Sequence, residues 1–227
     1  MPPAQYTHGA AIAFLHTSAL HIGTFNALGA ELAPELKLAH TVREDLLVAA
    51  EKAGGLTPSI EIRAGEALLA LAEGGAKVVV CTCSTLGPAA ERVADDADIP
   101  IMRIDRPMAD DAVKMGKRIG VCGALESAMT TAMRLLEDSA MRAGRHCEFT
   151  PVHFADAWES FRAGRLGEYH AAIAEGMSQA AESCDVLVLS QASMAPAARE
   201  AGDLGIPVLS SPHSGFAAAA RIAQRFR

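Results

Sequence analysis

The sequence predicts an α/β protein with two similar lobes, each containing a parallel sheet. The first observation is an internal repeat: residues 78–90 (VVVCTCSTLGPAA) are matched 108 positions later by residues 186–198 (VLVLSQASMAPAA). Residues 12–15 and 119–122 form a second matched pair in the same order, at an offset of 107. The second observation is that each apolar run is short and leads through small polar residues into a helical pattern. Buried parallel strands have this pattern, with their loops at the carboxyl ends.

Each expected element follows from a local pattern. We expect strands at 10–16, 36–42, 77–82, 100–104, 118–122, 147–153, 185–190 and 207–210. Helices fill most of the gaps between them, and the clearest spans residues 58–73, with Thr57 as its N-cap and Pro58 in its first turn. Its apolar stripe consists of Ile60, Ala64, Ala67, Leu68 and Leu71. Gly74 and Gly75 are expected to end it.

The repeat places the segment boundary near residues 110–118. We therefore expect two pseudo-symmetric Rossmann-like lobes, residues 1–112 and 113–227, with the last helix of the chain able to pack back on the first lobe. The sequence has no low-complexity linker, which favours lobes that pack face to face. Because ligands bind at the carboxyl ends of parallel strands in such folds, we expect the ligand site between the lobes.

Composition excludes several classes of protein. Half of the 227 residues are hydrophobic, the formal charge is −7, and no tract is rich in Lys and Arg, so we expect no nucleic-acid partner. No apolar run approaches the roughly 18 residues of a membrane span, and the N-terminus lacks the order of a secretory signal. We expect a soluble cytoplasmic protein that forms a homo-oligomer, a dimer or larger. Its five cysteines are interpreted as free thiols.

Cys83 is the leading candidate for a reactive group. It lies between an expected strand and the helix that begins near Pro88, a place where backbone dipoles can favour a thiolate. The alternative is a buried, inert cysteine. Alternation along a strand points Cys81 to the same side, but the repeat pairs Cys81 with apolar Leu189 and Cys83 with polar Gln191. Cys81 is therefore interpreted as a core residue, although spacing alone leaves both open.

The remaining cysteines fit the core better than a site. Cys122, Cys147 and Cys184 lie in or beside apolar strands. A metal pair from Cys81 and Cys83 is disfavoured, because C-x-C without another Cys/His cluster is not a zinc pattern. No Gly-rich phosphate motif is present, which disfavours nucleotide binding. We expect no metal and no organic cofactor.

Three short motifs resemble those of one family. Cys83-Ser84-Thr85 is similar to the first-lobe C-N-T motif of glutamate racemases, and Gln191-Ala192-Ser193 falls where the second-lobe C-T-H motif would lie. Residues 15–18 (LHTS) occupy the place of the first-strand F-D-S-G segment, with His16 at the Asp position. The chain thus resembles the aspartate/glutamate/hydantoin racemase superfamily. The resemblance implies amino-acid metabolism and two α/β lobes, each of which gives one cysteine to a cofactor-independent proton transfer.

The resemblance also indicates the site residues. The departure of this chain from the family motif at Gln191 matters most, because an amide cannot act as acid or base. A second proton-handling group would then come from His16, His21 or His213, of which His16 is preferred for its place in the motif. We expect Cys83 and His16 to be catalytic. Expected substrate-binding residues are Thr17, Ser18, Ser84, Thr85, Gln191, Ala192, Ser193 and His213. Ordinary capping is the alternative role for the hydroxyl residues.

Three functions are compatible with these residues. The first is a cysteine-dependent racemase or isomerase that acts on a small carboxylate or amino acid by proton transfer at the α-carbon. The second is a single-cysteine lyase of the decarboxylase type, for which one proton donor on one face suffices. The third is a non-catalytic protein that binds small carboxylates. Low aromatic content, with Trp158 the only tryptophan, mildly disfavours a large aryl pocket.

Overall fold

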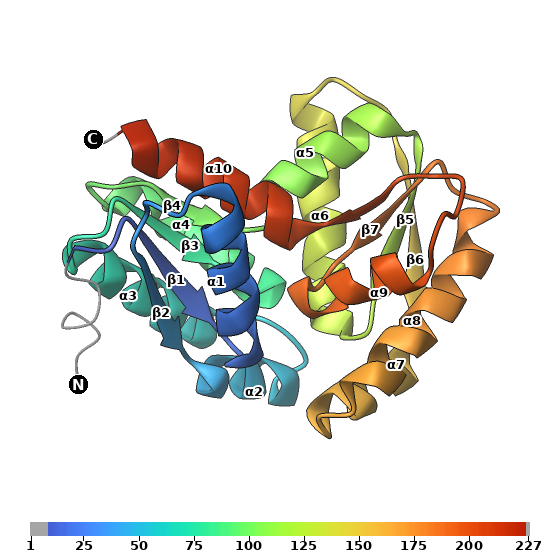
Figure 1. Ribbon diagram of the computed structural model, residues 1–227, viewed down its shortest axis with the longest axis horizontal. Helices are drawn as coiled ribbons and strands as arrows, with labels where there is room; N and C mark the ends of the chain where they lie inside the picture. Colours follow the sequence, from blue (N-terminus) through green and yellow to red (C-terminus); the bar gives the residue numbers. More distant parts are fainter. Residues whose placement is uncertain (1–8, 226–227) are drawn as a thin grey trace. The chain divides into compact units, whose positions relative to one another are not determined.

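The computed structural model describes residues 9–225 and divides the chain into two compact units, each with a four-stranded parallel sheet (Figure 1). One unit runs to Ile104 and takes in the chain from Pro212 onward, and the other is Asp105–Ser211. The strand order is β2-β1-β3-β4 in the first sheet and β6-β5-β7-β8 in the second. This common order confirms the duplicated α/β fold predicted from the repeat.

The first unit alternates strands and helices before its last helix. Its elements are β1 (Ile12–His16), α1 (Leu20–Leu32), β2 (Leu38–Val42), α2 (Glu44–Lys52), α3 (Pro58–Glu73), β3 (Val78–Cys81), η2 (Ser84–Leu86), α4 (Gly87–Val93), η3 (Ala94–Asp96), β4 (Ile101–Arg103) and α10 (Ser211–Arg225). Residue Ile12 pairs with Leu38 of β2 on one side and with Val78 of β3 on the other. The central strand β1 is therefore buried along its whole length.

The second unit repeats this order. Its elements are α5 (Arg106–Met115), β5 (Arg118–Gly123), α6 (Glu126–Arg142), β6 (Glu148–His153), α7 (Ala155–Arg162), α8 (Leu166–Ala181), β7 (Val186–Leu189), η4 (Ala192–Met194), α9 (Ala195–Glu200) and β8 (Val208–Ser210). Its central strand β5 pairs Ile119 with Phe149 of β6 and with Val186 of β7. All eight predicted strands are present, and their ends lie within two residues of the predicted ones.

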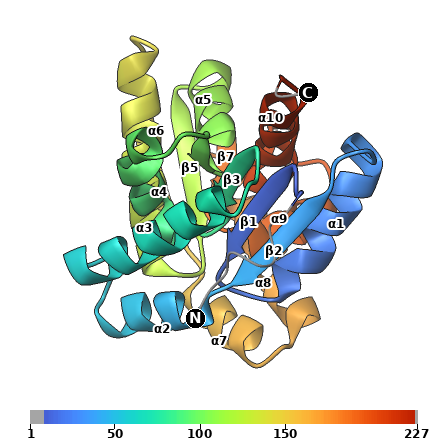
Figure 2. The ribbon, with the colours of Figure 1, turned by 90° about the vertical axis from the view of Figure 1, so that its left-hand side faces the viewer.

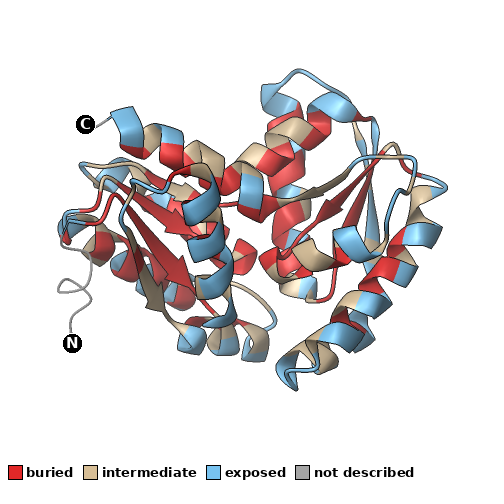
Figure 3. Ribbon diagram, viewed as in Figure 1, coloured by how far each residue is buried: buried red, intermediate tan, exposed pale blue. Residues whose placement is uncertain are grey.

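Alternate residues of the first sheet build two apolar layers. Phe14 and Val80 point into a cluster that includes Phe25 of α1 and Phe216 of α10. Residues on the opposite face, such as Leu15, pack in a separate cluster with α2, α3 and α4. Figure 2 shows α1 and α10 on one side of this sheet and α3 and α4 on the other. The inner strands β1 and β3 are buried on both faces, as near-continuous apolar runs require, whereas the edge strand β2 is mostly half-buried (Figure 3).

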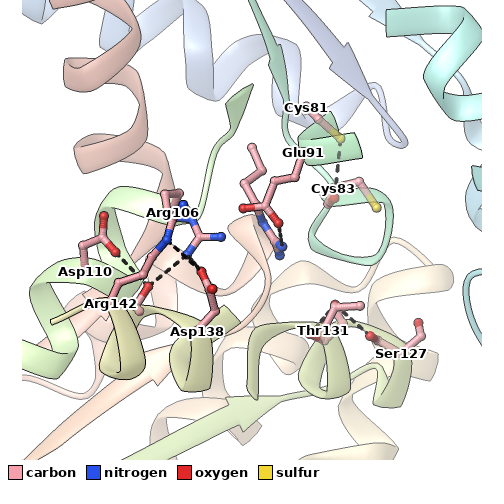
Figure 4. A network of polar contacts seen from close by, with 12 residues as sticks. Cys81, Cys83, Glu91, Arg106, Asp110, Ser127, Thr131, Asp138 and Arg142 are labelled. Atoms are coloured by element: carbon pink, nitrogen blue, oxygen red, sulfur yellow. Dashed lines mark hydrogen bonds and ion pairs between the residues drawn. The ribbon is translucent and has the colours of Figure 1, made fainter. Parts of the chain in front are cut away.

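The second sheet is covered in the same way. Ile119 and Val188 share one cluster with α5 and α6, while Leu187 packs on the other face with α7, α8 and α9. Polar contacts also join α5 to α6, since Arg106 pairs with Asp138 at 2.5 Å (Figure 4). Equivalent faces are thus covered by α1 with α10 in one unit and by α6 with α5 in the other.

Helices α5 and α10 decide where the units divide. The expected boundary near residue 112 lies inside α5, which belongs to the second unit from Asp105 onward. The physical reason is the apolar face of α5, where Met108, Ala112 and Val113 pack with β5, β7 and α6. Helix α10, which follows the last strand of the second sheet, belongs to the first unit. Gly215 permits its close approach there, because a Cβ would meet the Ile104 carbonyl.

Helix α3 has the predicted bounds. Its five predicted stripe residues are all buried, and Gly75 adopts a φ of +88° just beyond its end. Thr57 stands at the N-cap, but its side chain makes no capping hydrogen bond within the described chain. Across residues 9–225, none of the helices is both long and apolar enough to span a membrane.

Candidate active site

Cys83 lies at the carboxyl edge of the first sheet, two residues beyond the end of β3. It is the N-cap of η2 and has an extended backbone, with φ −100° and ψ 115°. Its carbonyl oxygen accepts hydrogen bonds from the Leu86 N–H at 3.0 Å and from the Cys81 thiol at 3.6 Å. Figure 4 shows the Cys81 sulfur pointing at this carbonyl and the Cys83 sulfur pointing away from it. Cys81 is fully buried, whereas Cys83 is partly exposed.

The other three cysteines occupy the second unit. Cys122 and Cys184 are buried in its core, and burial, with a smaller effect of Cys184, raises the pKa of the Cys122 thiol to about 12. Cys147 is partly buried and donates to the Gly116 carbonyl at 3.7 Å. A thiol whose pKa is raised by burial is a poor nucleophile or base at neutral pH. Cys83 differs from Cys122 and Cys184 in being partly exposed at a strand end.

The loop after β1 adds hydrogen-bond donors to the same edge. Thr17 is buried and Ser18 is half-buried, and the Ser18 hydroxyl oxygen accepts from the Leu20 N–H at 3.4 Å. Within residues 9–225, the backbone N–H groups of Thr17 and Ser18 meet no acceptor of the chain. Ser84 and Thr85 are buried in η2, directly after Cys83. The edge of the first sheet thus carries a thiol, several hydroxyls and two open backbone donors.

His16 is bonded through both of its ring nitrogens. Nδ1 lies 2.8 Å from Thr82 Oγ1, and Nε2 lies 2.9 Å from Nδ1 of His40. The side chain is fully buried, and desolvation, followed by the nearby His21 and His40, lowers the pKa of His16 to about 3. Burial lowers the pKa of His21 to about 4 and also lowers that of His40. His16 is therefore neutral at neutral pH and has no free nitrogen for a substrate.

His213 has different surroundings. Helix α10 begins at Ser211, so His213 lies in its first turn. Its side chain is exposed. Ser210 ends β8, and the buried Ser211 hydroxyl has no hydrogen-bond partner among the described residues. These positions follow the last strand of the second sheet.

Gln191 occupies in the second unit the place that Cys83 has in the first. It follows β7 by two residues and is the N-cap of η4. Its side-chain oxygen Oε1 accepts from the backbone N–H groups of Ala124 and Leu125, at 2.8 and 2.9 Å. These two N–H groups follow β5 as those of Thr17 and Ser18 follow β1. The open pair of donors in the first unit is therefore closed by a side chain in the second.

Ser193 belongs to a second network of the same unit. Its hydroxyl lies 2.8 Å from the buried Tyr169 hydroxyl, and its carbonyl oxygen lies 3.1 Å from Nε2 of His170. Burial raises the pKa of Tyr169 above its ordinary value, so the phenol stays protonated. Ala192, the residue before Ser193, is also buried. Tyr169 and His170 were not predicted as site residues, because they lie on α8, more than 20 residues before Ser193, and match no motif.

The two strand edges differ in what they can do chemically. The first combines a partly exposed thiol with open N–H donors, which can move a proton and bind an anion. The second presents a carboxamide whose oxygen is already used, so its remaining function is donation through Nε2. Among residues 9–225, no group of three His, Cys, Asp or Glu side chains is arranged to hold a metal ion. The expected position of the site between the lobes stays a prediction.

Comparisons with known proteins agree with this description of the fold. A glutamate racemase from Trichodesmium erythraeum (strain IMS101) is 40% identical over 73 residues, which are 31% of this chain and 27% of that protein's length. An aspartate racemase from Picrophilus torridus superposes with a TM-score of 0.69 at 11% identity, covering 95% of this chain and 94% of that one.

Two further solved structures have the same fold. A glutamate racemase isoform from Bacillus anthracis gives a TM-score of 0.67 at 15% identity, over 96% of this chain and 82% of that one. An allantoin racemase from Klebsiella pneumoniae gives a TM-score of 0.62 at 17% identity, over 96% of this chain and 87% of that one. The family model described as Asp/Glu/Hydantoin racemase matches residues 51–223, which include Cys83, Gln191, the whole second unit and nearly all of the first unit from the end of α2 onward. The chain belongs to the Asp/Glu/Hydantoin racemase family.

Proposed function

We propose that the protein is a cofactor-independent racemase or isomerase that moves a proton at the α-carbon of a small carboxylate or amino acid, with Cys83 as the proton-transferring thiol. The observation that carries the proposal is the pairing, in one unit, of a partly exposed thiol with open backbone donors. Cys83 follows β3, and the N–H groups of Thr17 and Ser18, which have no acceptor in the described part of the chain, follow the adjacent strand β1. Family membership supports the same class of reaction.

Proton removal beside a carboxylate has two requirements. A base must reach the α-carbon, and hydrogen-bond donors must meet the negative charge that builds on the carboxylate. In the proposed reaction the Cys83 thiolate takes the α-proton and becomes a thiol. The electron pair of the broken C–H bond moves into the carboxylate, where the N–H groups of Thr17 and Ser18 stabilise the charge. When the Cys83 thiol returns a proton to the same face, the thiolate is restored and the α-hydrogen has exchanged. When solvent water delivers the proton to the opposite face, the configuration inverts, and the Cys83 thiol gives its proton to the hydroxide that is left.

Gln191 favours a second candidate, a single-cysteine lyase. In the second unit a carboxamide stands where Cys83 stands in the first, and an amide neither gives nor takes a proton at neutral pH. A decarboxylase needs only one donor, because carbon dioxide leaves and one proton replaces it on the same carbon. Cys83 would then supply that proton. Both candidates use the same thiol and differ in the bond that breaks.

Deuterium exchange separates these reactions. A panel of small carboxylates and amino acids is incubated with the protein in deuterated water, and products are analysed by mass spectrometry and on a chiral column. We expect a substrate whose α-hydrogen exchanges without loss of carbon dioxide. Release of carbon dioxide with incorporation of one deuteron would support the lyase instead. Thermal stabilisation by a carboxylate with neither exchange nor carbon dioxide release would indicate a binding protein and contradict both enzymes.

A further inference from the structure

A line of hydrogen-bonded side chains crosses the first sheet and begins at the residue that precedes Cys83. It runs from Thr82 to His16 at the end of β1, on to His40 of β2, and ends at Asn26 of α1. The three contacts measure 2.8, 2.9 and 3.0 Å between their nitrogen and oxygen atoms. We call this line the histidine brace. It joins three neighbouring strands and the helix that covers them.

The histidine brace is buried at its inner end and open at its outer end. His16 is fully buried and Thr82 is 2% exposed, whereas His40 is half-buried and Asn26 is exposed. The ring of Phe14 stacks on both imidazoles, with centroids 5.6 Å from His16 and 5.3 Å from His40. Polar groups in such apolar surroundings are costly unless they are hydrogen-bonded. The contacts at the inner end are therefore strongly favoured.

The hydrogen bonds of the histidine brace can all be made with both imidazoles neutral. The single hydroxyl hydrogen of Thr82 is within reach of two acceptors, the Leu15 carbonyl at 3.1 Å and Nδ1 of His16. If Thr82 donates to His16, His16 donates through Nε2 to His40, and His40 donates through its own Nε2 to the Asn26 amide oxygen. If Thr82 donates to Leu15, His16 donates through Nδ1 and accepts from His40 through Nε2, and a neutral His40 then has no hydrogen left for Asn26. Both nitrogens of His16 are used in either case.

The second unit has no counterpart of the histidine brace. At the position of His16 it has Gly123, and a Cβ there would lie 2.8 Å from the Ser190 hydroxyl and 2.9 Å from the Met129 side chain. Ser190 stands where the first unit has Thr82. The residue that follows Ser190 is Gln191, which carries no thiol. The histidine brace is thus present only in the unit that contains Cys83.

Thr82 connects the histidine brace to Cys83 through one peptide bond. The Thr82 N–H donates to the Leu15 carbonyl at 3.0 Å, and its side chain makes the contacts described above. On the other side, the Cys83 carbonyl is held by Leu86 and Cys81. We propose that His16 is a positioning residue for Cys83: it holds Thr82 against the end of β1 and so fixes the backbone from which the thiol projects.

The experiment compares variants that keep or remove single hydrogen bonds. His16→Asn places an amide group near the position of Nδ1 and can keep the contact with Thr82, whereas His16→Leu removes both contacts. Thr82→Val removes the hydroxyl with little change in shape, and Thr82→Ser keeps it. His153→Ala, an exposed histidine of the second unit, is the control. Circular dichroism and thermal melting identify the variants that fold; if His16→Leu does not, the Thr82 pair makes the same comparison.

Two measurements report on the reactivity of Cys83. One is the rate at which iodoacetamide alkylates Cys83, measured by peptide mass spectrometry, and the other is kcat for deuterium exchange; only the second rests on the proposed function. We expect His16→Leu and Thr82→Val to change the alkylation rate in either direction and to lower kcat by about tenfold. A tenfold decrease in kcat corresponds to roughly the free energy of one lost hydrogen bond. KM should stay within about twofold. His16→Asn, Thr82→Ser and His153→Ala should resemble the parent.

The outcomes are distinct. An unchanged alkylation rate and kcat in both His16→Leu and Thr82→Val would overturn the positioning role. Equal losses in His16→Asn and His16→Leu, with Thr82→Val behaving like the parent, would also overturn it, because the effect would then come from the imidazole and not from its contact with Thr82. If no carboxylate exchanges in the parent protein, the proposed function fails, and the alkylation rates still test the histidine brace.

Discussion

The side-chain oxygen of Gln191 lies 2.9 Å from the backbone nitrogen of Leu125, at the start of α6. The same oxygen accepts from the Ala124 N–H, and Gln191 is only 8% exposed. One side chain thus satisfies two backbone donors that would otherwise be open. In the first unit, Cys83 holds the equivalent place, and the donors after β1 have no acceptor among residues 9–225. The contrast between the two units lies in this substitution of an amide for a thiol.

Removing the acceptor at position 191 should destabilise the protein. We expect Gln191→Ala to lower the free energy of unfolding by about 1–3 kcal/mol, because two buried N–H groups lose their partner. Gln191→Glu keeps an oxygen for both donors and should lose much less. Denaturant titrations of the three proteins make the comparison. Equal stability of Gln191→Ala and the parent would show that the contact contributes nothing.

A thiol at position 191 should add a second proton-handling group. We expect Gln191→Cys to raise α-proton exchange of a substrate above the parent rate, together with a loss of stability like that of Gln191→Ala. Exchange is followed by mass spectrometry in deuterated water, with Gln191→Ser as the control that has no thiol. A gain of the same size in Gln191→Ser would contradict a role for the new thiol.

The two cysteines at the end of β3 should behave differently. We expect Cys83→Ser to lower turnover by about 10²–10⁴-fold while the fold is kept, since an alcohol is a far weaker acid and base than a thiol. Cys81→Ser should leave turnover largely in place, because Cys81 is buried and a hydroxyl can still donate to the Cys83 carbonyl. Rates and melting temperatures are measured for both variants. The reverse result would identify Cys81 as the reactive thiol.

The buried His16 should make stability sensitive to acid. Its pKa is about 3 in the folded protein against 6.5 for an ordinary histidine, so the unfolded chain binds more protons between these values. The free energy of unfolding should therefore fall as the pH drops below 6.5, by roughly 1.4 kcal/mol per pH unit for this residue. His16→Asn cannot titrate and should show a smaller slope in denaturant titrations between pH 6.5 and 4. Identical slopes would contradict the lowered pKa.

Gly87 should not tolerate a side chain. A Cβ at this position would lie 2.5 Å from the guanidinium carbon of Arg103, which is 3% exposed and paired with Glu91 at 3.2 Å. We expect Gly87→Ala to lower the free energy of unfolding by about 1–3 kcal/mol through overpacking. Gly23→Ala in α1 meets no atom within 4 Å and should raise stability by up to about 1 kcal/mol. Thermal melts of the two variants test the contrast.

The sequence by itself determined the architecture, because the features that specify it are local. Short apolar runs predicted the strands, and the stripe from Ile60 to Leu71, bounded by Pro58 and Gly74, predicted α3. The repeat predicted two similar α/β units with parallel sheets, which the structure confirms, and the two sheets have equivalent strand orders. The short motifs around Cys83 and Gln191 indicated the family for the same reason, since each is contained in a few consecutive residues.

Only the tertiary structure decided how the side chains of the site are used. Alternation placed Cys81 and Cys83 on one side, and the fold separated them by burying Cys81 and leaving Cys83 partly exposed. His16 fitted the motif as a proton-handling group, yet its nitrogens are bonded to Thr82 and His40. The side-chain oxygen of Gln191 likewise accepts a hydrogen bond from the Ala124 N–H. The partners Thr82 and Ala124 lie more than 60 positions away along the chain, so these contacts form only when parallel strands bring their ends together.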